Sequence, residues 1–135
     1  MRYLLDEHID PVLRRALLRA APALEVWIIG DPGAPPRGML DPEILIWCEV
    51  NGFCLVTNNR KSMPRHLVGH LGLGRHMPGI FVVNLAMTMG QMIDELVLIA
   101  DASADDEYRN LIIYLPLSCA IQGFGPRVSG LGSRV

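Results

Sequence analysis

Five short apolar segments alternate along the chain with four segments of helical periodicity, and this alternation is the feature that most restricts the fold. The expected strands are residues 2–5, 25–29, 53–57, 80–84 and 111–115. The expected helices run from Asp10-Pro11 to Pro22, from Asp41-Pro42 to Asn51-Gly52, from Ser62 to Gly72, and over residues 88–102. Strands that alternate with helices pair in parallel through right-handed crossovers, and the helices cover both faces of the sheet. The sequence therefore predicts a three-layer α/β domain with a mainly parallel sheet of about five strands.

The length and composition indicate one folded unit followed by a tail. The chain has 135 residues, 50% of them hydrophobic, and a mean hydropathy of +0.29, which is enough for one core. Residues 1–121 are the predicted domain, and residues 122–135 form a glycine-rich C-terminal tail that we expect to be poorly ordered or held by a partner chain. The apolar fraction and this tail are also compatible with a homodimer.

Membrane proteins, secreted proteins and disulfide-rich proteins are poor matches to this sequence. Charge or glycine interrupts every apolar stretch before the ~18 to 20 residues that a membrane span needs, and Asp6 comes too early for a secretory signal. Cys48, Cys54 and Cys119 lie in apolar contexts without CxxC spacing, which is typical of small buried side chains in a reducing compartment. We expect a soluble, cytoplasmic protein that does not contact a membrane.

Charged residues are segregated along the chain. No carboxylate occurs between Glu49 and Asp94, where arginine, lysine and histidine residues are frequent, and an acidic block follows over residues 94–107. Such segregation can steer a polyanion to one face of a protein whose net charge is only −2. The alternative is two solvated surfaces of opposite charge with no partner.

Polar side chains follow the first and third expected strands. Asp6 and Glu7 come directly after the first strand, and Asn58-Asn59 after the third. Asp41 begins a helix that should start at the same, carboxyl edge of the sheet. Oxygen ligands from three segments, Asp6, Asp41 and Asn59, could hold Mg²⁺ and ready a water for attack on a phosphodiester. Asp41 has an equally good structural explanation as a helix N-cap.

Three motifs resemble those of a known family. Leu4-Leu5-Asp6-Glu7-His8, Asp41-Pro42-Glu43-Ile44-Leu45 and Leu55-Val56-Thr57-Asn58-Asn59-Arg60 are similar, in order and spacing, to the motifs of PIN-like domains of the DUF5615 group, relatives of the Mut7-C and VapC-type nucleases. The resemblance covers about residues 1–85.

The resemblance implies a Rossmann-like PIN-like domain whose Mg²⁺ or Mn²⁺ centre hydrolyses RNA, in many relatives as the toxin partnered by a small antitoxin protein. By this comparison Asp6 is the first acid of the centre and Asp41 the acid that precedes its central helix. Glu7 and Glu43 are auxiliary acids, and the Thr57 hydroxyl orients the site.

The third motif departs from the family pattern. Asn59 and Lys61 occupy positions where the family commonly has carboxylates, so the affinity for a hard dication should fall. Lys61, together with Arg60 and Arg65, could instead contact phosphate. Two interpretations follow, a metal-dependent ribonuclease or a catalytically impaired relative that binds RNA or a partner protein.

His66 and His70 lie four positions apart, at i and i+4, on the third expected helix. This spacing can hold zinc from one helix face, but the sequence offers no third ligand nearby. The alternative is two histidines at the surface or facing a nucleic acid. The methionines Met87, Met89 and Met92 are expected in the core.

Overall fold

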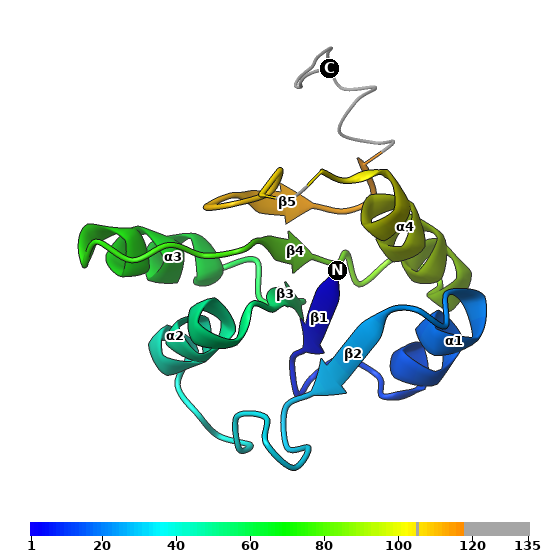
Figure 1. The fold of residues 1–135 in the computed structure, drawn as a ribbon, viewed down its shortest axis with the longest axis horizontal. Coiled ribbons are helices and arrows are strands. Elements are labelled where there is room, and N and C mark those ends of the chain that lie inside the picture. The colour runs from blue at the N-terminus through cyan, green and yellow to red at the C-terminus, as the bar shows by residue number, and fades with distance from the viewer. Residues whose placement is uncertain (105, 118–135) are drawn as a thin grey trace.

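The computed structural model describes residues 1–104 and 106–117 of the chain. It contains five strands and four helices in strict alternation (Figure 1). The elements are β1 (Arg2–Leu5), α1 (Val12–Ala20), β2 (Glu25–Ile28), α2 (Asp41–Asn51), β3 (Cys54–Thr57), α3 (Met63–Gly72), β4 (Ile80–Val82), α4 (Met89–Ala102) and β5 (Ile112–Tyr114). Cys119, the tail and the end of the predicted domain at residue 121 lie outside the described residues.

All neighbouring strands are parallel, and their order across the sheet is β2-β1-β3-β4-β5. Helices α1 and α4 cover one face, and α2 and α3 cover the other, as Figure 1 shows. The predicted three-layer α/β fold with a parallel sheet of about five strands is therefore confirmed.

The connection through α4 differs in hand from the one before it. The chain steps in the same direction across the sheet from β3 to β4 and from β4 to β5, yet α3 and α4 lie on opposite faces. The β3–α3–β4 and β4–α4–β5 connections therefore have opposite hands. The expectation that every crossover is right-handed is wrong for one of them. Helical periodicity could not predict the hand of the connection. It identifies the buried side of a helix but not the face of the sheet against which that side packs.

The sheet separates two hydrophobic cores. Successive side chains of a strand point to opposite faces, so Tyr3 and Leu5 pack with α1 and α4 while Leu4 packs with α2 and α3. The Tyr3 hydroxyl donates a 2.7 Å hydrogen bond to the carbonyl of Leu96, which anchors α4 over β1. Burial on both faces explains why β1 and β3 are apolar runs without alternation.

Helix α2 begins after Leu40 and ends at Gly52, and its N-cap differs from the predicted one. Leu40 is the N-cap and Asp41 is the first helical residue, so the interpretation of Asp41 as the N-cap is wrong. The helix ends where Gly52 adopts φ +76°, a left-handed conformation that glycine tolerates. Val50 is 73% exposed because it lies two residues, or about 200° around the helix, from the buried Cys48.

Thr88 caps α4 through a reciprocal pair of hydrogen bonds. Its hydroxyl accepts from the Gln91 N–H, and the Gln91 side chain accepts from the Thr88 N–H, which forms a capping box. This pair places the start of the helix one residue after the expected position.

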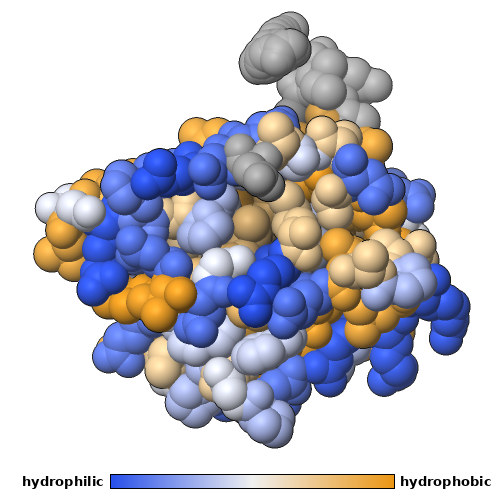
Figure 2. Space-filling view, viewed as in Figure 1, coloured by the Kyte–Doolittle hydropathy of each residue, from blue (hydrophilic) through white to orange (hydrophobic). Residues whose placement is uncertain are grey.

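Across residues 1–104 and 106–117, no helix combines the length and apolar character that crossing a membrane requires. The face seen in Figure 2 combines hydrophilic side chains with apolar patches, which lie over α4 on the right and at the end of α3 on the left. Leu98 on this helix is 56% exposed.

Candidate functional site

The sheet reverses its strand order between β1 and β3, and the polar residues gather at the carboxyl ends of these two strands. The chain leaves β1 through α1 on one face and returns to β3 through α2 on the other. The loops beyond such a reversal diverge to opposite faces and leave a crevice, which is where open α/β sheets bind ligands. We call Asp6, Asp41, Thr57 and Asn59 the edge site.

Asp6 follows β1 directly and is only 7% exposed. Its Oδ1 accepts a 2.7 Å hydrogen bond from the Glu7 N–H, and its Oδ2 accepts a 2.7 Å bond from the Thr57 hydroxyl. Its own N–H donates to the Val56 carbonyl, which extends the β1–β3 pairing by one residue. Both carboxylate oxygens therefore have donors, which is what a buried acid requires.

Thr57 joins Asp6 to the segment after β3. Its side chain is fully buried, and its Oγ1 accepts a 3.0 Å hydrogen bond from the Asn59 N–H while donating to Asp6. The hydroxyl proton is thereby directed at the Asp6 carboxylate. A β-branched side chain with one preferred rotamer suits this fixed position.

Asn59 joins this segment to Asp41 on α2. Its Nδ2 donates to Asp41 Oδ2 over 3.0 Å and to Ser62 Oγ over 2.7 Å, and its Oδ1 accepts from the Ser62 N–H over 3.2 Å. The amide orientation follows from these partners, since an N–H can only donate and a carboxylate can only accept. His66 Nε2 approaches the same Asp41 oxygen at 3.5 Å.

The hydrogen-bond chain thus connects two acids from separate segments, Asp6 and Asp41, through Thr57 and Asn59. Among the described residues no group of three or more His, Cys, Asp or Glu side chains is arranged to hold a metal ion. The Asn59 oxygen is engaged by the Ser62 N–H. A divalent ion at this edge would therefore use the two carboxylates together with water and substrate oxygens, a donor set that suits Mg²⁺.

The auxiliary acids differ in placement. Glu7 Oε1 accepts a 3.0 Å hydrogen bond from the Gly38 N–H, which fastens the loop between β2 and α2 to the end of β1. Glu43 is exposed in the first turn of α2, where its charge complements the helix dipole.

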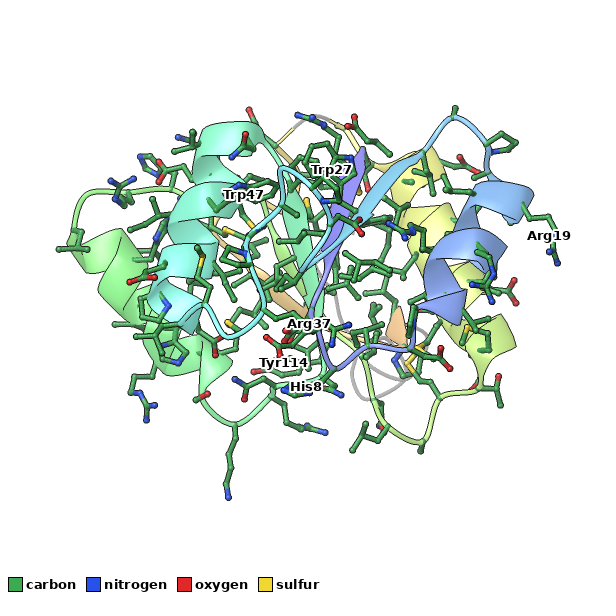
Figure 3. All side chains as sticks on the ribbon, turned by 90° about the horizontal axis from the view of Figure 1, so that it is seen from below. His8, Arg19, Trp27, Arg37, Trp47 and Tyr114 are labelled. Atoms are coloured by element: carbon green, nitrogen blue, oxygen red, sulfur yellow. The ribbon has the colours of Figure 1, made fainter. Side chains whose placement is uncertain are left out.

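The loop fastened by Glu7 brings Arg37 to the carboxyl edge. Figure 3 shows the side chains of His8, Arg37 and Tyr114 at one end of the sheet, with Trp27 and Trp47 toward the other end. The loop has no helix or strand, as its three prolines and three glycines over residues 30–38 predict.

Arg60, Lys61 and Arg65 are all exposed and follow the edge site in sequence. The Arg60 guanidinium lies over the ring of Tyr114, with 5.7 Å between the guanidinium carbon and the ring centroid. Tyr114 ends β5 and is 42% exposed. A cation beside an exposed ring is an arrangement that binds unstacked bases and phosphates.

Reasoning from sequence missed several residues at this edge. Ser62 is the N-cap of α3, but its hydroxyl accepts a hydrogen bond from Asn59 Nδ2 and caps no backbone N–H of the helix. The spacing of His66 predicts zinc binding, or a place at the surface or facing a nucleic acid, but not its 3.5 Å approach to Asp41 Oδ2. Tyr114 and Arg37 carry no local signal, since their placement depends on strand order and loop path.

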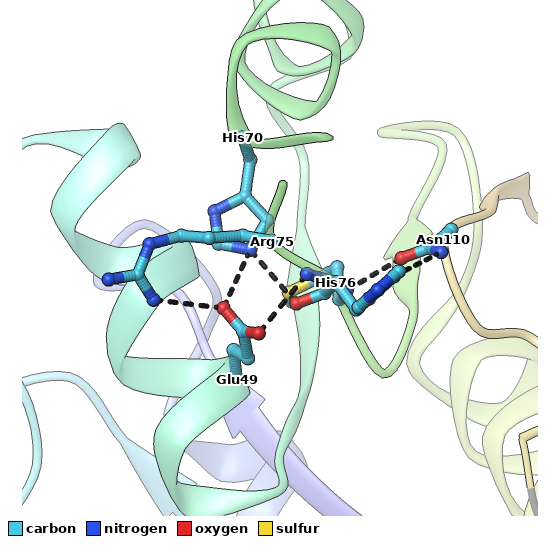
Figure 4. A network of polar contacts seen from close by, with 6 residues as sticks. Glu49, His70, Arg75, His76 and Asn110 are labelled. Carbon is cyan, nitrogen blue, oxygen red and sulfur yellow. Dashed lines mark hydrogen bonds and ion pairs between the residues drawn. The ribbon is translucent and has the colours of Figure 1, made fainter. Parts of the chain in front are cut away.

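His70 belongs to a separate network at the far end of α3, drawn in Figure 4. Its Nε2 lies 2.9 Å from the His76 carbonyl and 3.3 Å from Glu49 Oε1, and the residue is only 4% exposed. Glu49 also accepts from the Arg75 guanidinium and the His76 N–H, each over 3.1 Å. The expectation that both histidines lie at the surface or face a nucleic acid is therefore wrong for His70.

The fold and the edge site together define an all-parallel α/β protein with paired acids at its strand-order reversal. Comparison of the chain with protein-family models, with curated proteins and with solved structures found no match.

Proposed function

We propose that this chain is a PIN-like ribonuclease that uses Mg²⁺ or Mn²⁺ bound at the edge site. One observation carries the proposal: Asp6 and Asp41, 35 positions apart in the sequence, are joined at the carboxyl edge by the chain of hydrogen bonds through Thr57 and Asn59. Two carboxylates in the crevice of an open α/β sheet are a donor set for a hard divalent ion.

Asp6 and Asp41 are the residues that would hold the ion, and the ion would supply a polarised water and neutralise phosphate charge. In the hydrolysis, the water oxygen bonds to phosphorus, one P–O ester bond breaks, and the leaving oxygen takes the proton that the water gives up. Thr57 holds Asp6 in position through its 2.7 Å hydrogen bond. Asn59 neutralises no charge, but its amide holds Asp41 beside the start of α3.

Basic residues next to the edge site support RNA as the substrate. Arg60, Lys61 and Arg65 are exposed, and no carboxylate occurs in the sequence between Glu49 and Asp94. Phosphate attraction to such residues is independent of sequence and weakens as salt rises. Binding of single-stranded RNA should accordingly become weaker with increasing salt.

A second candidate is an RNA-binding protein without catalytic activity. The specific observation in its favour is the third motif, where Asn59 donates to Asp41 instead of offering a carboxylate. In this case the basic residues still attract RNA, and the Asn59 amide takes the role of the cation that would otherwise satisfy Asp41.

The test is cleavage of fluorescent single-stranded RNA with Mn²⁺ by the wild-type chain and by Asp6→Asn and Asp41→Asn. These substitutions keep the shape of each side chain and remove its charge. Because a metal site contributes several kcal/mol to the transition state, each should lower the rate by about 100-fold or more. Asp94→Asn, an exposed change on α4, is the matched control and should leave the rate unchanged.

Titration calorimetry with Mn²⁺ alone separates the two candidates. The ribonuclease requires Mn²⁺ binding that both Asp→Asn variants at the edge site weaken. Salt-sensitive RNA binding without Mn²⁺ binding or cleavage supports the second candidate. Cleavage that survives both substitutions contradicts the assignment of the edge site.

The role as a toxin is tested by expression in a bacterial host. If the chain degrades cellular RNA, induction should arrest growth, and Asp6→Asn should relieve the arrest. Equal arrest by both forms at equal protein level would refute this role.

A further inference from the structure

A cavity of about 210 Å³ opens at the carboxyl edge beside the edge site, on the side of the sheet covered by α1 and α4. We call it the rim cavity. It lies between the segments that follow β1, β3 and β4, and its polar lining comes from these three segments: His8, Asp10, Asn58 and Asn84. Asn58 directly follows Thr57, so the cavity and the Asp6–Thr57 hydrogen bond share one chain segment.

The walls of the rim cavity are apolar. Leu13 from α1 and Met92 from α4 line it together with Met87, and these side chains belong to the core on this face. Thioethers are polarisable and make favourable contacts with aromatic rings. Leu85 lies at the opening and is 84% exposed, so an apolar side chain stands in solvent next to an apolar cavity.

The polar lining can still form hydrogen bonds. Asn84 Oδ1 accepts from the Ala86 N–H over 2.8 Å, which leaves the Asn84 Nδ2 as a donor. The Asn58 side chain lines the cavity, and its amide carries both a donor and an acceptor. His8 is exposed at the same opening.

We propose that the rim cavity receives one unstacked nucleobase of single-stranded RNA, an inference that rests on the proposed function. Its volume is below the ~300–1,000 Å³ typical of pockets for drug-sized ligands, which suits one planar heterocycle. Apolar walls with a few polar groups at the opening match a base, whose faces are apolar and whose edges form hydrogen bonds. Arg60 and Lys61, a few residues beyond Asn58, provide positive charge for the adjoining phosphates.

The role of the rim cavity follows from its position next to the edge site. A base held beside Asn58 places its own ribose-phosphate near Asp6, since Asn58 and the Thr57 that bonds Asp6 are consecutive. The rim cavity therefore positions the strand for hydrolysis, and the amide of Asn58 selects among bases.

The experiment measures fluorescence anisotropy of two labelled strands in EDTA, where no metal-dependent cleavage occurs. One is a short single-stranded RNA of mixed sequence, and the other is a strand of equal length with abasic residues. The wild-type chain should bind the unmodified strand about tenfold more tightly, as one stacked and hydrogen-bonded base contributes. The ratio of the two affinities is the readout, because a general change in charge alters both affinities alike.

Leu85→Ala and Asn84→Asp should each reduce this ratio several-fold. Asn84→Asp retains an oxygen for the Ala86 N–H, so the turn is preserved, and it replaces the Nδ2 donor by an acceptor. The negative charge that it adds lowers both affinities alike, so a change in the ratio reports the lost donor. Leu73→Ala is the matched control, because Leu73 is also strongly exposed, at 74%, but lies beyond α3. It should leave the ratio unchanged, and circular dichroism should confirm that all variants are folded.

Two further results overturn the proposal in different ways. Equal affinity for both strands, unaffected by either variant, means that RNA binds through its phosphates alone, and the proposed function survives. Equal affinities would also result if the rim cavity instead accepted an apolar side chain of a partner protein. Absence of binding to either strand removes the RNA proposal itself.

Discussion

The hydroxyl of Thr57 donates a 2.7 Å hydrogen bond to Oδ2 of Asp6, and both side chains are buried. A buried carboxylate is tolerated only where its oxygens have donors, so this contact is a condition for having an acid at the end of β1. The Asn59 N–H also donates to the Thr57 hydroxyl, so one oxygen atom couples the two sides of the edge site.

Thr57→Val should destabilise the fold, because it keeps the shape of the side chain and removes the donor to Asp6. An unsatisfied buried oxygen costs about 1–3 kcal/mol in the free energy of unfolding. The measurement is the midpoint and slope of urea denaturation. Thr57→Ser retains the hydroxyl and should recover most of the loss, whereas equal destabilisation by both variants would assign the effect to the missing methyl group.

Asn59→Asp should make the stability of the chain depend on divalent ions. The substitution replaces the donor to Asp41 by a third carboxylate, and two carboxylates about 3 Å apart repel each other and raise one pKa. Without metal the melting temperature should fall by several degrees, as expected for a loss of about 1 kcal/mol. Addition of Mn²⁺ should reverse the loss by binding the folded state.

The control for this experiment is Asn84→Asp, which adds the same charge at the same edge away from Asp41. Its melting temperature should respond to Mn²⁺ no more than that of the wild-type chain. A similar response from both variants would mean that the ion acts by general screening.

The convergence of Asp6, Asp41 and Asn59 could be predicted from sequence because it depends mainly on topology. Parallel strands end at one edge, and a helix that feeds a strand begins at that edge, so residues at these ends meet. The orientation of the Asn59 amide could not be predicted. It depends on the Ser62 N–H and the Asp41 carboxylate, whose relative positions are set by the packing of α3 against α2.

The hydrogen-bond partners of Glu7 and His70 could not be predicted from sequence either, because they lie on other segments of the chain. Gly38 reaches Glu7 through a loop without regular structure, whose path no periodicity describes. The buried His70 has polar partners because its Nε2 lies beside Glu49 of α2 and the His76 carbonyl. These contacts form only when α2, α3 and the turn after α3 are packed together. Contacts between side chains of separate elements therefore required the structure.

Glu49→Gln should lower stability at neutral pH, since Glu49 accepts hydrogen bonds from the Arg75 guanidinium and the His76 N–H. The change would place an amide N–H opposite one of them, with an expected loss of about 1–2 kcal/mol. The His76 N–H, and then the Arg75 guanidinium, hold the pKa of Glu49 below its usual 4.5, against the opposing effect of partial burial.

The pH dependence of this difference follows from the direction of the pKa shift. The lowered pKa in the folded state contributes stability that is complete above 4.5 and is lost as the pH falls through the lower folded-state value. The difference between wild type and Glu49→Gln should thus be constant from about pH 6 to 8 and shrink in acid. Urea denaturation of both proteins, from acid pH up to pH 8, measures this difference in the free energy of unfolding. A difference that grows in acid would contradict the assigned role of Glu49.

Two glycines of similar exposure should respond to alanine in opposite directions. Gly52 has φ +76°, and an added Cβ would lie 3.6 Å from an Arg2 side-chain nitrogen, so the cost of Gly52→Ala is mainly conformational, about 1–2 kcal/mol. Gly69 lies within α3, and an added Cβ would meet nothing within 4 Å. Because alanine favours the helix, Gly69→Ala should stabilise the chain by up to about 1 kcal/mol. Thermal or urea denaturation of Gly52→Ala and Gly69→Ala tests the conformation at the end of α2 and the continuity of α3. Stabilisation by both variants would show that Gly52 does not adopt the left-handed conformation.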